Sequence, residues 1–386
     1  SPTVVVADGS GGVTVGADDL ILTGPQLFDY LSNGLGENNR PLLHTFSVYE
    51  FTSDGYTLSH REYSPSFNTR SGSKSIGETY ASVSQYVFGS WQASGKLMGL
   101  APYGDPLVEG LLVSKDEIGV YNYDFKWKFD VSEAVAEDKY MNYANLAASV
   151  QYGLELALKS RFALYVNKKS EVVFTGGIAL NSVANHKIRK DLGFDDFYLF
   201  PAQHDAGVSI GAAVSAYFYV TGKVVSTAFD ADYLGYIYSR EDVVRALNKY
   251  SGLVVFKKIT SGEIAAKLAA GDVLGYFSLE KGSEFGPRAL GARSILADPR
   301  SLKTWSFINR WVKFREDFRP FAPMVARDYL SKYFDCDGSF PYMLEVVSVR
   351  EEYRNQLLAI THVDGTARVQ TVDKGVNESL HDLLLN

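Results

Sequence analysis

The chain has 386 residues, of which 46% are apolar, 13% aromatic and 22% charged, as is typical of globular domains. This length indicates two or three domains, each large enough to bury a core. The net charge of −7 argues against a general nucleic-acid or anionic-membrane binder. No apolar run reaches the roughly 20 residues of a membrane span. The single cysteine, Cys336, excludes an intramolecular disulfide and a cysteine-based metal site.

Both ends of the sequence lead us to expect a piece of a longer protein. It begins at Ser1, without Met, directly in an apolar run, and it ends at Asn386 inside a predicted helix. We recognise no signal peptide, and the single cysteine fits a reducing compartment, so we expect a cytoplasmic location.

Strands and helices are predicted to alternate along the first half of the chain. A loop punctuated by Gly and Pro is expected at 93–106. The predicted strand segments are 3–15, which includes a Gly-rich turn, 44–51, 57–63, 171–177 and the start of 196–207. The predicted helices are 75–89, 142–166, 179–193, which stops at Gly193, and 208–220.

The alternation stops at 221–239, which we interpret as a linker, and a second unit follows. Alternation in both halves favours an α/β architecture, with domains at 1–225 and 226–386. The predicted helices of this half are 239–250, 261–271 with Ser261 as N-cap, and 380–386, and the predicted strands are 252–259 and 272–278.

The first candidate site is "VVVADGSGG", where Asp8 follows an apolar strand and precedes a Gly-rich turn that includes Gly11 and Gly12. Glycines let backbone amides approach an anion closely, and a neighbouring carboxylate can hold the metal that accompanies a phosphate. The alternative is a tight β-turn capped by an aspartate.

The second candidate is "VVFTGGIALNSVANHKI", where a buried strand opens at Gly176 and Gly177 into a helix. Free amides and the positive end of the helix dipole meet at such a turn. Asn181 and Asn185 are four residues apart and share one helix face, where two amides can hydrogen-bond a nucleoside. Paired glycines at a strand–helix junction are equally common as packing devices.

The third candidate is "FPAQHDAGVSIGAA", where His204 and Asp205 lie in a loop before a helix of small residues. An aspartate stabilised by the helix dipole is the alternative. The three segments follow the order of the phosphate, adenosine and second phosphate elements in the superfamily of acetate and sugar kinases, heat-shock proteins and actin, which they resemble.

The fourth candidate is the arginine-rich run "EFGPRALGARSILADPR" at 284–300, continued by "SFINRWVKFREDFRPFAP" at 306–323. Residues 284–319 contain eight Lys or Arg and four Asp or Glu, a local net charge of +4. Guanidinium groups bind phosphate in a bidentate fork, and converging cations stabilise a small polyanion. A basic solvated face explains poorly why Gly, Pro, Phe and Trp interrupt the charges, and no nucleic-acid-binding motif is present.

The sequence resembles the O-carbamoyltransferases of antibiotic and nodulation-factor biosynthesis. The resemblance rests on five segments in the family's order: "GKLMGLAPYG" at 95–104, "TGGIALNSVAN" at 175–185, "EFGPRALGARSILADPR" at 284–300, "NRWVKFREDFRPFAP" at 309–323 and "THVDGTARVQTV" at 361–372. They span nearly the whole chain, and the third and fifth are very specific.

The resemblance implies an amino-terminal actin-like ATPase domain, similar to the catalytic domain of tRNA threonylcarbamoyl transferases. It also implies a carboxyl-terminal domain similar to threonylcarbamoyl-adenylate synthase. Such enzymes make carbamoyl-adenylate from carbamoyl phosphate and ATP in the second domain. The carbamoyl group then passes to a substrate hydroxyl at the first, beside a nucleotide bound to a divalent metal, Fe or Mg.

Residue by residue, the resemblance implies Asp8 and Asp205 as metal ligands. His204 is a candidate general base because it neighbours Asp205 and histidine commonly serves in that role. It implies a nucleotide site and a pocket for carbamoyl phosphate and the adenylate. The nucleotide site comprises Gly11, Gly12, Gly176, Gly177, Asn181 and Asn185. The pocket comprises Arg288, Arg293, Ser294, Lys313, Arg315 and Arg319.

Two family elements fall outside this sequence: a histidine pair that completes the metal site would precede Ser1, and an "NTSFN"-like segment would follow Asn386. The expected partner is a small-molecule hydroxyl acceptor, with no nucleic acid and no membrane, and the expected assembly is a homodimer. Two alternatives remain open, a nucleotide-binding relative without transferase activity and a tRNA-modifying enzyme of the threonylcarbamoyl type.

Overall fold

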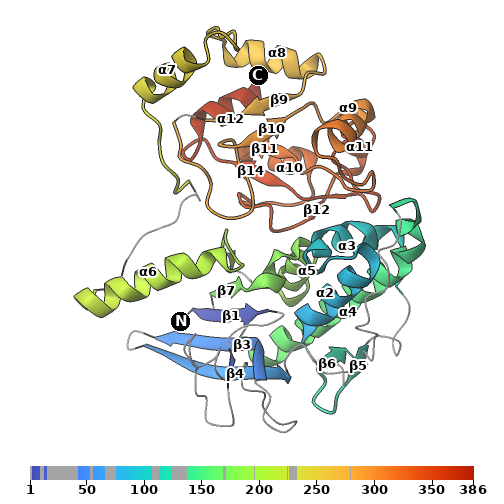
Figure 1. Cartoon of the computed structure of the whole chain (residues 1–386). Helices are drawn as coiled ribbons and strands as arrows, with labels where there is room; N and C mark the ends of the chain where they lie inside the picture. Colours follow the sequence, from blue (N-terminus) through green and yellow to red (C-terminus); the bar gives the residue numbers. More distant parts are fainter. Residues whose placement is uncertain are drawn as a thin grey trace. The chain divides into compact units, whose positions relative to one another are not determined.

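The computed structural model describes most of the chain as two compact units, Ser1–Asp205 and Ala206–Asn386 (Figure 1). The contacts divide the chain at the start of helix α6, whereas the sequence predicts a boundary at 225/226 within the linker, and that boundary stays a prediction. The described residues are 2–8, 13–14, 42–52, 55–65, 75–106, 113–123, 137–167, 171–194, 196–223, 225, 233–278 and 280–386.

The first unit is built on a six-stranded mixed sheet in the order β2-β3-β1-β7-β8, with β4 paired to β3. Strands β1, β7 and β8 run parallel, whereas β3 runs antiparallel to β1 and forms a hairpin with β4. The strands are β1 Thr3–Ala7, β2 Val13–Thr14, β3 Leu42–Thr52, β4 Gly55–Pro65, β7 Val172–Thr175 and β8 Phe197–Leu199. A separate hairpin joins β5 Val113–Lys115 and β6 Tyr121–Tyr123.

Helices pack on this sheet around a core of phenylalanine rings. Phe162 of α4 is fully buried, and its ring contacts those of Phe46, Phe174, Phe194 and Phe197 at centroid distances of 5.1 to 6.2 Å. The helices are α2 Ile76–Phe88, α3 Ser94–Leu100, α4 Ala144–Tyr165 and α5 Ser182–Leu192, with 3₁₀ turns η1 Trp91–Ala93, η2 Ala101–Tyr103, η3 Glu137–Tyr143 and η4 Gly177–Leu180. The predicted stop of α5 at Gly193 is confirmed, because Gly193 caps the helix at φ 69°.

The prediction of a loop at 93–106 is wrong. Residues 94–103 form α3 and η2, because Leu97, Met98 and Leu100 bury their side chains and outweigh the low helix propensity of the intervening glycines. A Cβ on Gly104 would lie 2.2 Å from the backbone of Ala144, so close packing of η2 on α4 explains this glycine.

The second unit contains short paired strands surrounded by helices. Strand β9 pairs antiparallel with β10, β11 pairs parallel with β14, and β12 pairs antiparallel with β13. The strands are β9 Leu274–Tyr276, β10 Ser294–Leu296, β11 Met324–Ala326, β12 Val347–Ser348, β13 Thr366–Ala367 and β14 Gln370–Val372. The helices are α6 Ala206–Thr221, α7 Arg240–Lys249, α8 Ser261–Ala269, α9 Leu302–Phe307, α10 Leu330–Tyr333, α11 Glu351–Arg354 and α12 Glu378–Leu385, with a π-helical turn η5 at Ile308–Val312 and a 3₁₀ turn η6 at Arg327–Tyr329.

Two predictions for this unit are wrong. The apolar run 252–259 forms no strand, because it finds no partner strand and its Leu253 and Val255 are exposed. The N-cap of α8 is Thr260 and not Ser261. Thr260 accepts a hydrogen bond from the backbone of Glu263, and the Glu263 carboxylate accepts one from the Thr260 backbone.

Among the residues that the model describes, no helix is long and apolar enough to cross a lipid bilayer.

A buried arginine ties together the first unit. Arg161 of α4 is 1% exposed, and its guanidinium donates to both carboxylate oxygens of Glu62 on β4 at 2.8 to 2.9 Å. It also donates to Tyr121 O, Ala157 O and Asn122 Oδ1. One side chain therefore joins β4, α4 and the hairpin that contains β6.

We predict that Arg161→Met lowers the free energy of unfolding by about 3 kcal/mol, because it removes the cation paired with the Glu62 carboxylate and the side-chain donor to Tyr121 O and Asn122 Oδ1. Urea denaturation measures this. The matched control on the same helix is Lys159→Met, which removes an exposed ion pair to Asp191 and is expected to change stability by less than about 1 kcal/mol. Equal losses in the two variants would contradict the assigned role of Arg161.

Candidate functional site

In the first unit, the three predicted segments meet at one edge of the sheet. Because β1, β7 and β8 are parallel neighbours, their carboxyl ends lie together, which is where open α/β sheets bind ligands. A Cβ on Gly176, whose φ is +95°, would lie 2.2 Å from Ala7 O, and a Cβ on Gly177 would lie 2.9 Å from Asp8 Oδ1. The paired glycines therefore let the turn after β7 lie against Asp8.

The loop after β8 joins the same edge. The backbone N–H of Gly176 donates to Gln203 O at 3.1 Å, next to the predicted residues His204 and Asp205. His204 is partly buried and Asp205 is exposed. The structure thus brings Asp8, the glycine pair and the loop before α6 to one place, whereas Gly11 and Gly12 lie outside the described residues.

The two predicted asparagines are engaged within the protein. Asn181 caps α5 by accepting from Ala184 N, and its amide exchanges hydrogen bonds with Gln151. Gln151 in turn accepts from the Tyr80 hydroxyl. Asn185 is fully buried and donates to Ala179 O at 2.7 Å. These contacts position the turn between β7 and α5.

The described residues at this edge do not provide a full set of metal ligands. Among the described residues, no group of three or more His, Cys, Asp and Glu side chains is arranged to hold a cation. The two predicted ligands, Asp8 and Asp205, come from the ends of adjoining segments. We therefore derive no chemical step through a metal.

In the second unit, residues 284–294 form a compact segment, hereafter the anion loop, organised by one carboxylate. The Glu284 side chain is 0% exposed. Its Oε1 accepts from the backbone N–H groups of Leu290 at 2.5 Å and Ala292 at 2.8 Å, and its Oε2 accepts from Arg293 Nε at 3.2 Å. Ser294 Oγ accepts from Gly291 N at 2.9 Å. Arg293 and Ser294, both predicted to bind substrate, are thus used to hold the loop.

Arg288 projects from the anion loop without a counter-charge. Its side chain makes no hydrogen bond or ion pair with the part of the chain that the structure describes, and its Nε is buried. Burial, with repulsion from Arg319, lowers the pKa of Arg288. A guanidinium removed from water without a carboxylate beside it is a site for an anion.

Two further predicted arginines lie in the same electrostatic neighbourhood. Burial and then repulsion from Arg319 lower the pKa of Arg315 to about 10. Its Nε donates to Asn309 Oδ1 at 2.6 Å, and its guanidinium lies 4.4 Å from the centre of the Phe321 ring. Arg319 lies 3.9 Å from the Glu316 carboxylate, a distance too long for a hydrogen bond. Arg288, Arg315 and Arg319 are hereafter the arginine cluster.

The segment that carries Arg315 has an unusual backbone. Asn309 is fully buried in the π-helical turn η5, and its amide donates to Arg319 O at 3.2 Å while its oxygen accepts from Arg315. Phe314 has a positive φ of 47°, which is rare for a residue other than glycine, and its side chain is 79% exposed. π-helical turns and strained residues cluster at functional sites, which agrees with the placement of the arginine cluster here.

The remaining cations of the region divide into two kinds. Arg310 pairs with Asp317 at 2.6 Å, and Arg300 pairs with Asp298, so both charges are compensated on the surface. Lys313, which was predicted to bind substrate, is exposed, and its ammonium makes no ion pair with the described residues.

Sequence reasoning missed Glu284 and Asn309, which position the arginines. Neither has a sequence signal of its own, since each acts through backbone groups six to ten residues away. The available signal was indirect: each stands at the start of an arginine-rich segment.

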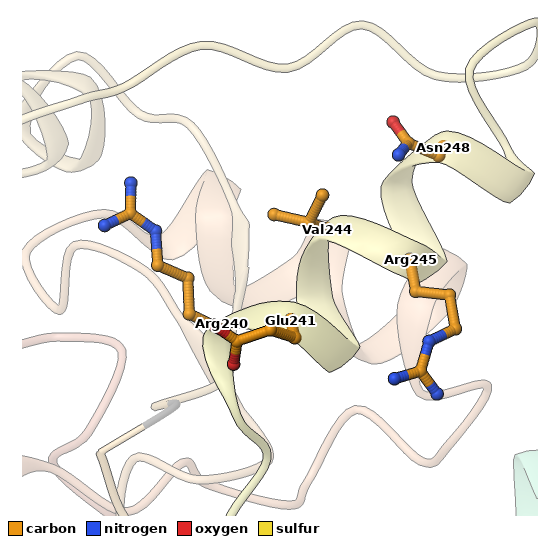
Figure 2. Close-up of a pocket in the computed structure, with 5 residues that line it drawn as sticks. All are labelled: Arg240, Glu241, Val244, Arg245 and Asn248. Carbon is orange, nitrogen blue, oxygen red and sulfur yellow. The ribbon is translucent and has the colours of Figure 1, made fainter.

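A shallow depression on α7 has no such chemistry. Its lining comes from this one helix, and Figure 2 shows the side chains of Arg240 and Arg245 pointing away from each other. Arg245 lies 3.4 Å from Asp242 of the same helix. No converging set of groups is formed, so this surface supports no ligand.

These features define an α/β protein whose second unit carries the arginine cluster, with the Arg288 guanidinium unpaired among the described residues. Comparison with protein families places it more narrowly. Residues 41–214 match the model described as carbamoyltransferase N-terminus, and residues 265–386 match carbamoyltransferase C-terminus. The chain belongs to the carbamoyltransferase family, which confirms the resemblance seen in the sequence.

Curated relatives agree with this assignment. Nodulation protein NolNO of Sinorhizobium fredii is 33% identical over 81% of this chain and 48% of its own length. Nodulation protein NolO of Bradyrhizobium diazoefficiens is 34% identical over 80% of this chain and 60% of its own length. The 3'-hydroxymethylcephem-O-carbamoyltransferase of Amycolatopsis lactamdurans is 35% identical over 56% of this chain and 39% of its own length. The chain therefore spans about half the length of the curated relatives it matches.

We predict that Glu284→Gln destabilises the anion loop, because the replacement amide removes the charge opposite Arg293 and presents an N–H₂ group to backbone donors. The expected loss in the free energy of unfolding is about 3 kcal/mol. Urea denaturation measures it. Glu280→Gln, an exposed substitution just before the loop, serves as the control and is expected to stay within about 0.5 kcal/mol of the wild type. A Glu284→Gln variant with the same free energy of unfolding as the wild type would contradict the role of this carboxylate.

Proposed function

We propose that this chain is part of an O-carbamoyltransferase that transfers a carbamoyl group to a small-molecule hydroxyl. In this proposal the arginine cluster binds the phosphate of carbamoyl phosphate. The observation that carries the proposal is the Arg288 guanidinium, which is largely buried and has no counter-charge among the described residues. Membership of the family, and the Amycolatopsis relative named for carbamoylation of a hydroxymethyl group, supply the chemistry.

The finer mechanism that we propose runs through carbamoyl-adenylate. Carbamoyl phosphate and water give carbamate and phosphate, and a carbamate oxygen then attacks the α-phosphorus of ATP with release of pyrophosphate. Each step expels a phosphate-bearing group, and fixed guanidiniums stabilise the charge that develops on it. Lys313, exposed beside Arg315, is suited to a longer polyanion such as the triphosphate.

The transfer step is proposed for the edge of the first sheet. The substrate hydroxyl attacks the carbonyl carbon of the adenylate, AMP leaves, and His204 accepts the hydroxyl proton. The turn at Gly176 and Gly177, and Asn181 and Asn185 with Gly11 and Gly12, form the proposed nucleotide site of an actin-like domain. If a divalent cation binds there, Asp8 and Asp205 would supply carboxylate ligands that neutralise phosphate charge.

The decisive experiment supplies the purified chain with ATP and carbamoyl phosphate and follows pyrophosphate release. Release that requires both substrates is the expected result. Nucleotide binding without release would instead favour a relative that has lost transferase activity. Binding of tRNA with a steep dependence on salt concentration would favour the tRNA-modifying alternative.

We predict that Arg288→Ala weakens carbamoyl phosphate binding about 10- to 150-fold, the equivalent of about 1.5–3 kcal/mol for a charge-assisted contact. Isothermal titration calorimetry measures the dissociation constant. Arg310→Ala is the control, because Asp317 already compensates the charge of Arg310 in the same region. The affinity of this variant for carbamoyl phosphate is expected to match that of the wild type. The proposal fails if both variants bind as the wild type does.

A further inference from the structure

The anion loop is contacted by a segment that belongs to the predicted linker. Residues 233–235, hereafter the strap, run antiparallel to the start of the loop, with a β-bridge between Tyr233 and Glu284 and a hydrogen bond from Gly235 N to Ser283 O at 2.9 Å. A Cβ on Gly282 would lie 2.0 Å from Gly235 O, and a Cβ on Gly235 would lie 2.6 Å from Ser283 N. The two backbones are thus in direct contact.

The hydroxyl of Tyr233 bridges two elements that are distant in sequence. It donates to Leu290 O in the anion loop and accepts from Asn377 Nδ2 at 3.1 Å. Asn377 is 1% exposed and caps α12, because its Oδ1 accepts from Leu380 N at 3.1 Å. Leu380 in turn packs against Gly291, whose φ is +95°. A hydroxyl can donate and accept hydrogen bonds at the same time, as this bridge requires.

Leu290 is consequently held at both of its backbone polar groups, its N–H by Glu284 and its carbonyl by Tyr233. Arg288 lies only two residues before it. No described side chain or carbonyl hydrogen-bonds the Arg288 guanidinium, so its position depends on the backbone of the loop and on the atoms packed around it.

We propose that Tyr233 is a positioning residue for anion binding: its hydroxyl fixes the loop at Leu290 and thereby holds Arg288 toward the phosphate group of the substrate. The inference rests on the proposed function, since it assigns Arg288 a phosphate ligand. It adds that a residue of the segment between the two family-matched regions controls how well that ligand binds.

A merely structural role would have a different signature. The strap keeps its backbone hydrogen bond and its glycine contacts when only the hydroxyl is removed. Tyr233→Phe is therefore expected to fold, while the Leu290 carbonyl loses its donor and Asn377 loses its acceptor. Tyr236→Phe is a matched control in the same stretch, because Tyr236 is 69% exposed and its hydroxyl makes no hydrogen bond with the described residues.

The experiment measures the affinity of the full chain for carbamoyl phosphate, and for inorganic phosphate, by calorimetry in the wild type, Tyr233→Phe and Tyr236→Phe. We expect both dissociation constants to rise about tenfold in Tyr233→Phe, as for the loss of a buried hydrogen bond, and to stay unchanged in Tyr236→Phe. In the pyrophosphate assay, KM for carbamoyl phosphate should rise while kcat changes less than twofold.

A double-mutant cycle with Arg288→Lys tests whether Tyr233 acts through Arg288. If it does, the double variant loses clearly less affinity than the product of the two single effects. Multiplicative losses would overturn the inference, and so would a Tyr233→Phe variant that binds like Tyr236→Phe. In either case the proposed function would still stand if the wild type bound carbamoyl phosphate and Arg288→Ala bound it more weakly. If the wild type bound neither probe, the proposed function itself would fail, and the inference with it.

Discussion

The second unit is organised around one electrostatic imbalance, at Arg288. Its guanidinium is held partly out of water, lies near the guanidinium of Arg319, and is bonded to no described carboxylate. Arg288 and Arg319 repel each other, and burial makes the charged form of Arg288 less favourable still. Nearby acids are present, but Glu284 is occupied by backbone donors and Arg293, and Glu316 stands 3.9 Å from Arg319. The Glu284 carboxylate thus shapes the loop, and in the proposed function an incoming anion would relieve the remaining repulsion.

The two units differ in the groups that the proposed anion sites would use. In the first, parallel strands end together, and Gly176 and Gly177 let the chain turn against Ala7 and Asp8, so backbone amides are brought to the edge of the sheet. In the second, side chains supply the charge and a buried carboxylate supplies the shape. In the proposed function, backbone amides at the strand–helix turn would bind phosphate in the first unit, and guanidiniums would stabilise the charge that develops on phosphate groups in the second.

The sequence predicts the first unit well because its signals are local. Strand β1 alternates in burial, α5 ends at a glycine in the left-handed region, and the glycine pair marks the turn after β7, so each is readable from a few adjacent residues. The run 252–259 misled the prediction because its apolar residues resemble a strand, and only a partner strand, which the sequence does not reveal, makes one. The helix at 94–100 was missed because burial of its leucines outweighs glycine propensity.

The candidate site shows the same limit. Arginine-rich composition identifies the region, yet it does not separate the arginine that meets a ligand from the arginine that supports the loop. Arg293 and Arg288 are five residues apart in one motif, and only the position of the Glu284 carboxylate distinguishes the first, which it holds, from the second, which has no partner among the described residues. That assignment depends on contacts across the loop, which residue type and spacing alone do not determine.

Stability and site geometry are supplied by different parts of the molecule. The first unit satisfies its buried arginine, since Arg161 donates to a carboxylate, an amide and two carbonyls. The second leaves Arg288 unsatisfied and also holds Phe314 at a positive φ with its ring exposed, both of which oppose folding in the absence of ligand. Such features persist only where the surrounding structure fixes them. The buried contacts of Glu284 and Asn309 hold this arrangement, and in the proposed function a bound anion would stabilise it further.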